Sequence, residues 1–156
     1  MEKSLLVKDQ TKWEADSHRK PKLRTFVVFK DFKHETSYLF KPLSFVQRKS
    51  LAKLRLGVLT LRIETGRFVR PRLQAEERLC LICNSGEVED ESHFLLRCET
   101  YNIERQRLFE KIEDPVSFAL LPDKEKLQIL LNDPDFVKTT SQFIVDSFDR
   151  RSLFVL

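Results

Sequence analysis

The chain of 156 residues has little glycine and no long apolar run. It contains only three glycines, and its apolar runs, such as Phe26–Phe29, are a few residues long. Scarce glycine disfavours a turn-rich β architecture and favours helices. The short runs exclude a membrane-spanning helix, and the N-terminus lacks the apolar stretch and cleavage site of a signal peptide. With 41% hydrophobic and 33% charged residues, the sequence predicts one globular domain.

Cysteine is absent from the chain except in one segment of nineteen residues. All three cysteines fall there, in the pattern Cys80-x2-Cys83-x9-His93-x4-Cys98. Three cysteines cannot all pair within one chain, and no βαβ pattern supports a thioredoxin-like redox pair. Three thiolates and one imidazole are instead the ligand set of a structural, four-coordinate zinc site. We therefore predict one structural Zn²⁺, and the free thiols favour a nuclear or cytoplasmic location.

Catalytic motifs are also missing from the sequence. No His-x-Glu precedes the Cys-x-x-Cys pair, which excludes the zinc deaminase pattern. Neither His-Glu-x-x-His nor a phosphate-binding glycine-rich loop is present. A zinc ion with four protein ligands has no open position for substrate. We therefore expect the chain not to be an enzyme, and a hidden hydrolase is the least favoured alternative.

Charge is distributed unevenly along the chain. Residues 1–78 contain 19 Lys/Arg against 9 Asp/Glu, whereas residues 79–156 contain 9 against 15. A basic half is a candidate surface for an acidic partner such as RNA or DNA, although a solvated helical surface explains the same charge. The stretch His18–Lys22 is either a basic linker or a crude nuclear-localisation patch.

The hydrophobic pattern predicts a mainly α fold. We expect helices over residues 5–16, 43–57, 99–112, 120–131 and 134–153, and a short helix or buried strand over residues 22–33. Residues 57–78 read as an irregular basic connection. The near-heptad stripe Phe136, Phe143, Ile144 and Phe148 is typical of core packing rather than of a partner groove. One compact domain with a single zinc knuckle is therefore predicted, in four segments: residues 1–40, 41–78, 79–101 and 102–156.

The helix predicted over residues 43–57 has an apolar and a basic side. Leu43, Leu51, Leu54 and Val58 fall on one side, and Lys41, Arg48 and Arg55 lie roughly opposite. The basic side and the following connection are free to meet phosphate or water. The candidate nucleic-acid contacts are Arg48, Lys49, Lys53, Arg55, Arg62, Arg67, Arg70 and Arg72.

The zinc segment itself carries two further expectations. Asp90 is a plausible N-cap for a helix that carries His93. Residues five apart lie about 140° apart around an α-helix, so we expect this helix to end or kink before Cys98. An acidic stretch (Glu87, Glu89, Asp90 and Glu91) lies within the segment. A cluster of three thiolates with Zn²⁺ carries one negative charge, and we expect this region to repel a phosphate backbone.

Several strings of residues together resemble a known family. They are Leu51-Ala52-Lys53-Leu54-Arg55-Leu56-Gly57, Glu64-Thr65-Gly66-Arg67-Phe68, Glu77-Arg78-Leu79-Cys80 and Glu91-Ser92-His93-Phe94. With the Cys-x2-Cys and His-x4-Cys frame, residues 10–154 resemble the C-terminal zinc-binding region of reverse transcriptases from animal non-LTR retrotransposons. The spacing differs from that of retroviral nucleocapsid knuckles, which have a shorter gap before the histidine.

This resemblance implies a role as well as a ligand set. In that family the region follows the polymerase domain and is thought to help hold template RNA or target DNA. It implies that Cys80, Cys83, His93 and Cys98 bind zinc, with Arg55, Arg62 and Arg67 in the basic segment upstream. We expect the chain to correspond to such a tail, without polymerase or endonuclease residues.

Two functions remain open at the level of sequence. The first is a zinc-structured module that binds RNA or DNA through residues 41–78. The second is a structural or protein-interaction module that docks on a reverse transcriptase core, with apolar helices as the contact and no nucleic-acid binding of its own. Exposed Phe143 and Phe148 on the last helix would favour the second.

Overall fold

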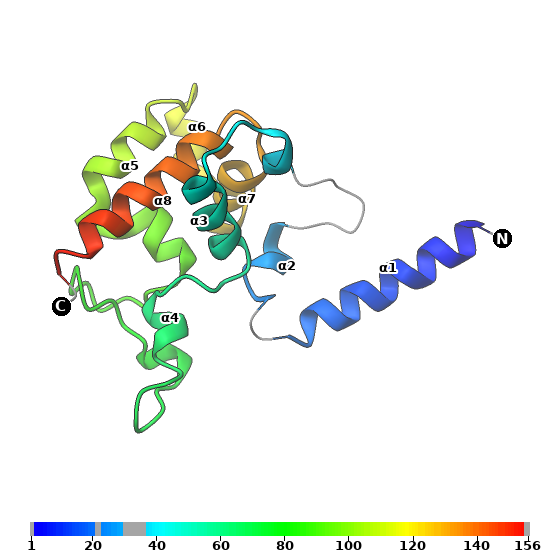
Figure 1. Cartoon of the computed structure of the whole chain (residues 1–156), viewed down its shortest axis with the longest axis horizontal. Helices are drawn as coiled ribbons and strands as arrows, with labels where there is room; N and C mark the ends of the chain where they lie inside the picture. The colour runs from blue at the N-terminus through cyan, green and yellow to red at the C-terminus, as the bar shows by residue number, and fades with distance from the viewer. Residues whose placement is uncertain (1, 21–22, 30–36, 155–156) are drawn as a thin grey trace.

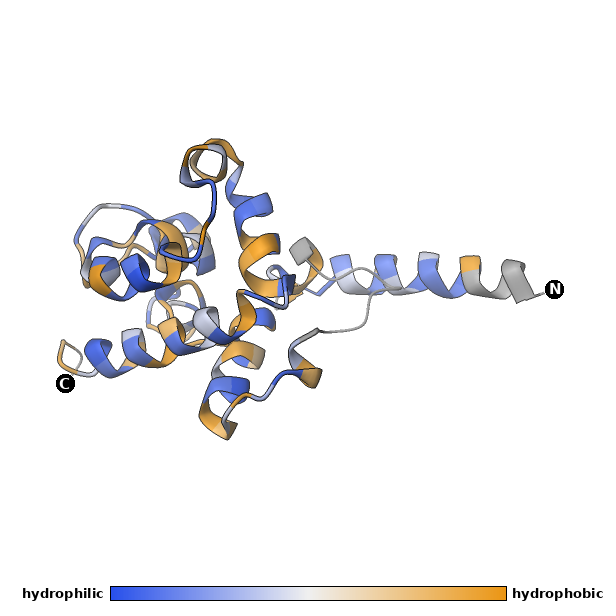
Figure 2. Cartoon of the chain, turned by 90° about the horizontal axis from the view of Figure 1, so that it is seen from above, coloured by the Kyte–Doolittle hydropathy of each residue, from blue (hydrophilic) through white to orange (hydrophobic). Residues whose placement is uncertain are grey.

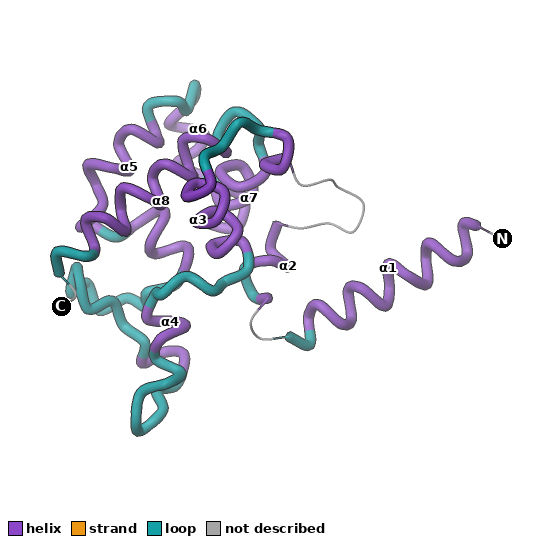
Figure 3. The backbone as a smooth tube through the Cα atoms, in the orientation of Figure 1, coloured by secondary structure: helices purple, strands orange, loops and turns teal. Residues whose placement is uncertain are grey.

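The computed structural model describes residues 2–20, 23–29 and 37–154, and its fold is mainly α-helical, as the sequence predicts. Eight α-helices occur in these ranges, and the β pairing found there is one isolated bridge between Leu79 and Val88 (Figure 3). Pro21 and Lys22 of the basic joint, and residues 30–36 with His34, lie outside the described residues. No helix in the described part has both the length and the apolar run needed to cross a membrane.

The first helix projects from the rest of the molecule (Figure 1). This helix, α1, spans Glu2–His18, and most of it is hydrophilic (Figure 2). Its C-terminal end meets the short helix α2 (Phe26–Phe29), where the rings of Trp13 and Phe26 lie 6.1 Å apart and Ser17 is buried. The helix predicted over residues 5–16 is thus present, and the second element is a helix rather than a strand.

The body of the molecule is built around the last helix. Helix α8 (Val137–Arg151) packs against α3 (Phe45–Arg55), α5 (Asn102–Phe109) and α7 (Asp123–Asn132). The sequence predicted these four helices, with ends displaced by a few residues. It did not predict α6 (Pro115–Leu120), which begins where the Asp114 carboxylate accepts a hydrogen bond from the Ser117 amide.

Helix α3 begins and ends at local signals. Ser44 and Gln47 form a reciprocal capping box, so the helix starts at Phe45 rather than at the predicted residue 43. Gly57, with a φ of 65°, follows its end. Leu51 and Leu54 are fully buried, but Val58 lies beyond the helix and is 38% exposed. The assignment of Val58 to the core was therefore wrong.

An aromatic cluster joins the segment of the four candidate metal ligands to α8. The ring of Phe94 lies 5.1 Å from that of Tyr101, 5.4 Å from Phe143 and 5.6 Å from Phe148. Phe143 and Ile144 are buried and Phe148 is partly buried against the core. The aromatic stripe is therefore mainly core packing, as predicted, although Phe136, just before α8, is only partly buried.

Candidate metal centre

The first two cysteines lie on a small hairpin, residues 79–88, which we call the knuckle. Cys80 donates its amide to the Glu87 carbonyl at 2.8 Å, and the Glu89 amide bonds to the Arg78 carbonyl at 3.0 Å. The chain reverses through Asn84 and Gly86, whose φ angles are 53° and 77°. Asn and Gly tolerate this left-handed conformation, which is why the Cys-x-x-Cys turn folds back towards residue 88.

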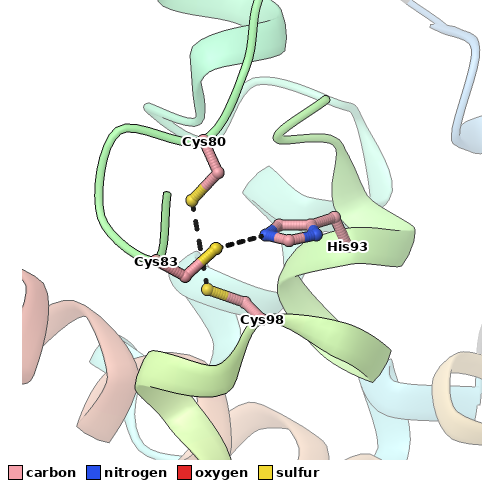
Figure 4. Close-up of side chains that lie close together, drawn as sticks. All are labelled: Cys80, Cys83, His93 and Cys98. Atoms are coloured by element: carbon pink, nitrogen blue, oxygen red, sulfur yellow. Dashed lines mark hydrogen bonds between the residues drawn. The ribbon is translucent and has the colours of Figure 1, made fainter. Parts of the chain in front are cut away.

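The three cysteines and His93 converge on one point (Figure 4). Their ligand atoms all lie within 4.8 Å of one another, with Cys80 Sγ 4.0 Å from Cys98 Sγ and Cys83 Sγ 3.3 Å from His93 Nε2. Bonds of about 2.0–2.3 Å in a tetrahedron place ligand atoms roughly 3.5–3.8 Å apart. The four residues can therefore hold one metal ion.

The backbone from His93 to Cys98 explains how two residues five apart can face the same point. The Asp90 carboxylate accepts the His93 amide at 2.7 Å, which confirms the predicted cap. Residues His93–Arg97 form a π-helical turn, η4, and the Cys98 amide bonds to the His93 carbonyl at 2.7 Å. This wide i to i+5 turn brings Cys98 beneath His93, as an α-helix would not. The chain leaves helical geometry at Cys98, as predicted.

A second layer of polar residues orients the histidine. His93 Nδ1 lies 3.0 Å from Glu87 Oε2, and the same oxygen accepts from Arg97 Nε at 2.8 Å. Arg97 also pairs with Asp123 at the start of α7. A metal-binding histidine commonly donates its other ring N–H to a carboxylate, which leaves the free nitrogen for the metal. Nε2 is the nitrogen that faces the three sulfurs.

Hydrogen bonding within the cluster shifts its protonation. The bond with Cys98, together with burial, raises the pKa of Cys80 to about 12. Burial lowers the pKa of His93, but hydrogen bonds to Cys80, Glu87 and Cys83 outweigh it and raise that pKa to about 9. Hydrogen bonds from Arg97 and His93 lower the pKa of Glu87. A metal ion that binds here displaces protons from the thiols and the imidazole.

Two of the four acidic residues of the segment, Glu89 and Glu91, are internal rather than part of its surface. Glu89 is 1% exposed, and its carboxylate pairs with Arg151 of α8 and accepts the Arg62 amide at 2.6 Å. Glu91 is buried and pairs with Arg24 at 2.7 Å. Glu89 and Glu91 are each paired with an arginine from a distant segment, so they do not add the surface charge on which the expected repulsion of phosphate was based.

A buried arginine that sequence analysis did not single out supports the ligand-bearing turn. Arg105 of α5 is 5% exposed and donates to the carbonyls of Leu95 (2.8 Å), Phe94 (3.2 Å) and Cys98 (2.7 Å). The π-turn and the break at Cys98 leave these carbonyls without the partners of a continuous α-helix. Seven residues separate Arg105 from Cys98, and no local motif in the sequence marks the contact.

Another buried arginine connects the knuckle to the basic connection. After α4 (Arg62–Thr65), residues 66–74 form a loop that projects from the helical body (Figure 1), and we call it the finger. Arg78 is 6% exposed and donates to the Leu73 carbonyl at 2.9 Å and the Ile63 carbonyl at 2.8 Å. A Cβ at Gly66 would lie 2.6 Å from Cγ of Arg78, so the Arg78 side chain can make these hydrogen bonds because residue 66 is glycine.

The eight predicted nucleic-acid contacts do not form one face. Four are exposed: Lys49 and Lys53 on α3, and Arg70 and Arg72 on the finger. Arg62 is partly buried, and Arg67 pairs with Glu64 at 3.2 Å. Arg48 is also partly buried and donates to the carbonyls of Tyr38, Leu39 and Lys41.

Arg55 corrects the predicted basic side of α3. It is 4% exposed, donates to the Leu131 carbonyl at the end of α7, and lies over the Tyr38 ring at 5.1 Å. Burial lowers its pKa to about 10, so it stays charged at neutral pH. Arg55 follows Leu51 by four residues and so lies only about 40° from it around the helix, beside the apolar side rather than opposite it. Helix α7 and the 3₁₀ turn η2 (Ser37–Phe40) cover that side of α3.

Comparison of the chain with protein-family models, with curated proteins and with solved structures found no match. The function therefore rests on the geometry of the centre and of the finger that is attached to it.

Proposed function

We propose that this chain is a non-catalytic module, organised by one structural Zn²⁺, that binds nucleic acid. The observation that carries the proposal is the convergence of three sulfurs and one imidazole, within 4.8 Å, on a largely buried point. Cys80, His93 and Cys98 are each at most 3% exposed. Such a module corresponds to the accessory zinc-binding tail of a non-LTR reverse transcriptase, which the sequence resembles.

The ligand set favours Zn²⁺ as the bound metal and a structural rather than a catalytic role for it. Thiolate and imidazole ligands favour Zn²⁺ over the hard cations Mg²⁺ and Ca²⁺, which take oxygen ligands. Four protein ligands complete a tetrahedral shell, so neither water nor substrate can bind the ion. The metal fixes the knuckle against the turn of His93–Arg97, and through Arg78 it fixes the base of the finger.

The finger is the proposed contact with nucleic acid. It contains three arginines and no acidic residue, and the side chains of Arg70 and Arg72 are exposed. Exposed guanidinium groups bind phosphate, and their binding releases counterions from the nucleic acid. Phe68, which is 72% exposed beside them, supplies a ring on which an unpaired base can stack.

Metal content of the purified full chain tests the first half of the proposal. Elemental analysis should find one zinc per chain in the wild type. The Cys83→Ser variant should lose that zinc, and Ser85→Ala, two residues away in the same turn, should keep it. Wild-type protein that neither contains zinc as purified nor takes it up would contradict the structural role.

Binding of labelled single-stranded RNA and DNA across a salt series tests the second half. The variant with Arg70→Glu and Arg72→Glu should bind more weakly, and each lost phosphate contact lowers the slope of log affinity against log salt by about 0.7. Lys124→Glu with Lys138→Glu, two exposed lysines in the acidic half, is the matched control and should bind almost as well as the wild type. Equal affinity for both charge-reversed pairs would overturn the finger as the contact.

A second candidate function is docking on a protein. It is favoured by a group of exposed apolar side chains on η2 and the start of α3: Leu39 (55%), Phe40 (74%), Phe45 (78%) and Val46 (55%). Exposed apolar groups of this kind occur at protein interfaces. Zinc-loaded protein that shows no nucleic-acid affinity at physiological salt would favour this function instead.

A further inference from the structure

A pocket of about 720 Å³ lies between the end of α5, helix α6, the end of α7 and the start of α8. Its apolar lining consists of Ile112, Phe118, Leu121, Ile129 and Phe136. Neither the metal centre nor the finger contributes to it. Figure 1 shows α6 and the finger at opposite ends of the helical body, so a molecule cannot fill its own pocket with its own finger.

The rim of this pocket is acidic. Glu113, Asp114, Asp133 and Asp135 line it together with a single cation, Lys111. None of the four carboxylates forms an ion pair within the ranges that the structure describes, although Asp114 caps α6 and Asp133 accepts the Asp135 amide. We call this site the acidic pocket. Its chemistry suits a large apolar side chain flanked by cations, because the ring would be buried while the cations meet the rim.

The finger of this same chain has that chemistry. Phe68 is the most exposed aromatic side chain of the finger, at 72%, and the guanidinium groups of Arg70 and Arg72 lie close to it in sequence and are exposed. The finger is held in shape by Arg78, so its docking would cost less conformational entropy than that of a mobile loop.

We propose that the finger of one molecule docks into the acidic pocket of a second copy, with Phe68 in the pocket and Arg70 and Arg72 at its rim. The two surfaces of this contact differ, so a pair of molecules keeps one free finger and one free pocket, and the association can continue head to tail. Nucleic acid and the second copy would then compete for the same finger. This inference goes beyond the proposed function, and it does not require that function to be correct.

Sedimentation of the zinc-loaded full chain, without nucleic acid, tests the contact. At low salt the wild type should form dimers and larger species as its concentration rises, and added salt should dissociate them because the contact depends on charge. A finger variant (Arg70→Glu with Arg72→Glu) should be monomeric. A pocket variant (Glu113→Lys with Asp135→Lys) should also be monomeric, and both should keep the wild-type circular dichroism.

Mixing the two variants provides the decisive comparison. The finger variant retains a working pocket and the pocket variant retains a working finger, so an equal mixture should form a 1:1 dimer and nothing larger. A mixture that stays monomeric, or a finger variant that still associates, would overturn the proposal, the latter by assigning association to another surface such as Phe40 and Phe45. A wild type that is monomeric at all concentrations would also overturn it and leave the pocket to a different basic partner.

Discussion

Buried and partly buried arginines hold the parts of this molecule together. Arg55, Arg78, Arg105 and Arg151 each connect segments distant in sequence or close a turn that has lost its own hydrogen bonds. A guanidinium group carries five donors, so one side chain can satisfy several carbonyls or a whole carboxylate. Arginine therefore contributes to the interior here as well as to the charge of the surface.

Replacing Arg105 by Ala should lower the free energy of unfolding by about 3 kcal/mol, because three buried carbonyls lose their charged donor. Arg107→Ala is the matched control on the same helix, since Arg107 is largely exposed and lies 3.9 Å from Asp146. The control should change stability by less than about 0.5 kcal/mol. Urea unfolding of both zinc-loaded variants measures the difference, and equal losses would contradict the supporting role of Arg105.

At the scale of elements, the ion pair of buried Glu89 and partly buried Arg151 joins the knuckle to the end of α8. Glu89 also accepts the Arg62 amide at 2.6 Å, and Arg151 also bonds to the Tyr101 hydroxyl at 3.2 Å. The pair therefore lies where α4, the knuckle and α8 meet. A buried ion pair is most costly when one partner alone is removed.

Glu89→Gln should accordingly destabilise the zinc-loaded protein by about 3 kcal/mol, since Arg151 keeps its charge without a counter-ion. Glu99→Gln, at an exposed position just beyond the last metal ligand, should have little effect. Thermal and urea unfolding compare the two. A neutral effect of Glu89→Gln would contradict the role of this ion pair in joining the knuckle to α8.

The finger depends on the absence of a side chain at Gly66. Its φ of −62° is open to any residue, so space rather than backbone conformation requires glycine. Gly66→Ala should push Arg78 away from the carbonyls of Ile63 and Leu73 and increase hydrogen exchange across residues 66–74. The control Ala75→Gly, just after the finger, should leave the hydrogen bonds of Arg78 to Ile63 and Leu73 intact. Unchanged hydrogen exchange in Gly66→Ala would mean that Arg78 can shift without opening the finger.

At the scale of the whole molecule, metal and helical packing stabilise different regions. Leu51, Leu130 and Ile144 are fully buried between α3, α7 and α8, away from the ligands. The knuckle, in contrast, has one β bridge, and its aliphatic side chains are exposed or only partly buried. We therefore expect its order to depend on a metal ion bound by the four candidate ligands and on the arginines around it.

Chelation of the metal should therefore unfold the molecule in part. Hydrogen exchange should rise from residue 66 to residue 98 and stay low in α3, α7 and α8. The midpoint of thermal unfolding should fall by on the order of 10 °C, since each kcal/mol shifts it by about 2–4 °C in a domain of this size. Added zinc should reverse both changes. Loss of protection throughout the chain would instead mean that the helical body also requires the metal.

Much of this architecture follows from local sequence. The four ligands are identifiable because cysteine occurs nowhere else, and the cap at Asp90 and the break before Cys98 follow from spacing and helix geometry. The helices α3, α7 and α8 follow from apolar periodicity. Helix α6 was missed because it has only six residues, fewer than two turns, which is too short for a periodic pattern.

The sequence by itself therefore determined the helical class of the fold and the residues that can hold a metal ion. Only the tertiary structure decided which charges are internal, because an arginine is buried by partners that lie far away in the chain, 76 residues for Arg55 and Leu131 and 62 for Arg151 and Glu89. Periodicity reports the face of one helix, whereas burial depends on every segment that packs against it. For that reason a basic side predicted to meet phosphate became, at Arg55, part of the interior.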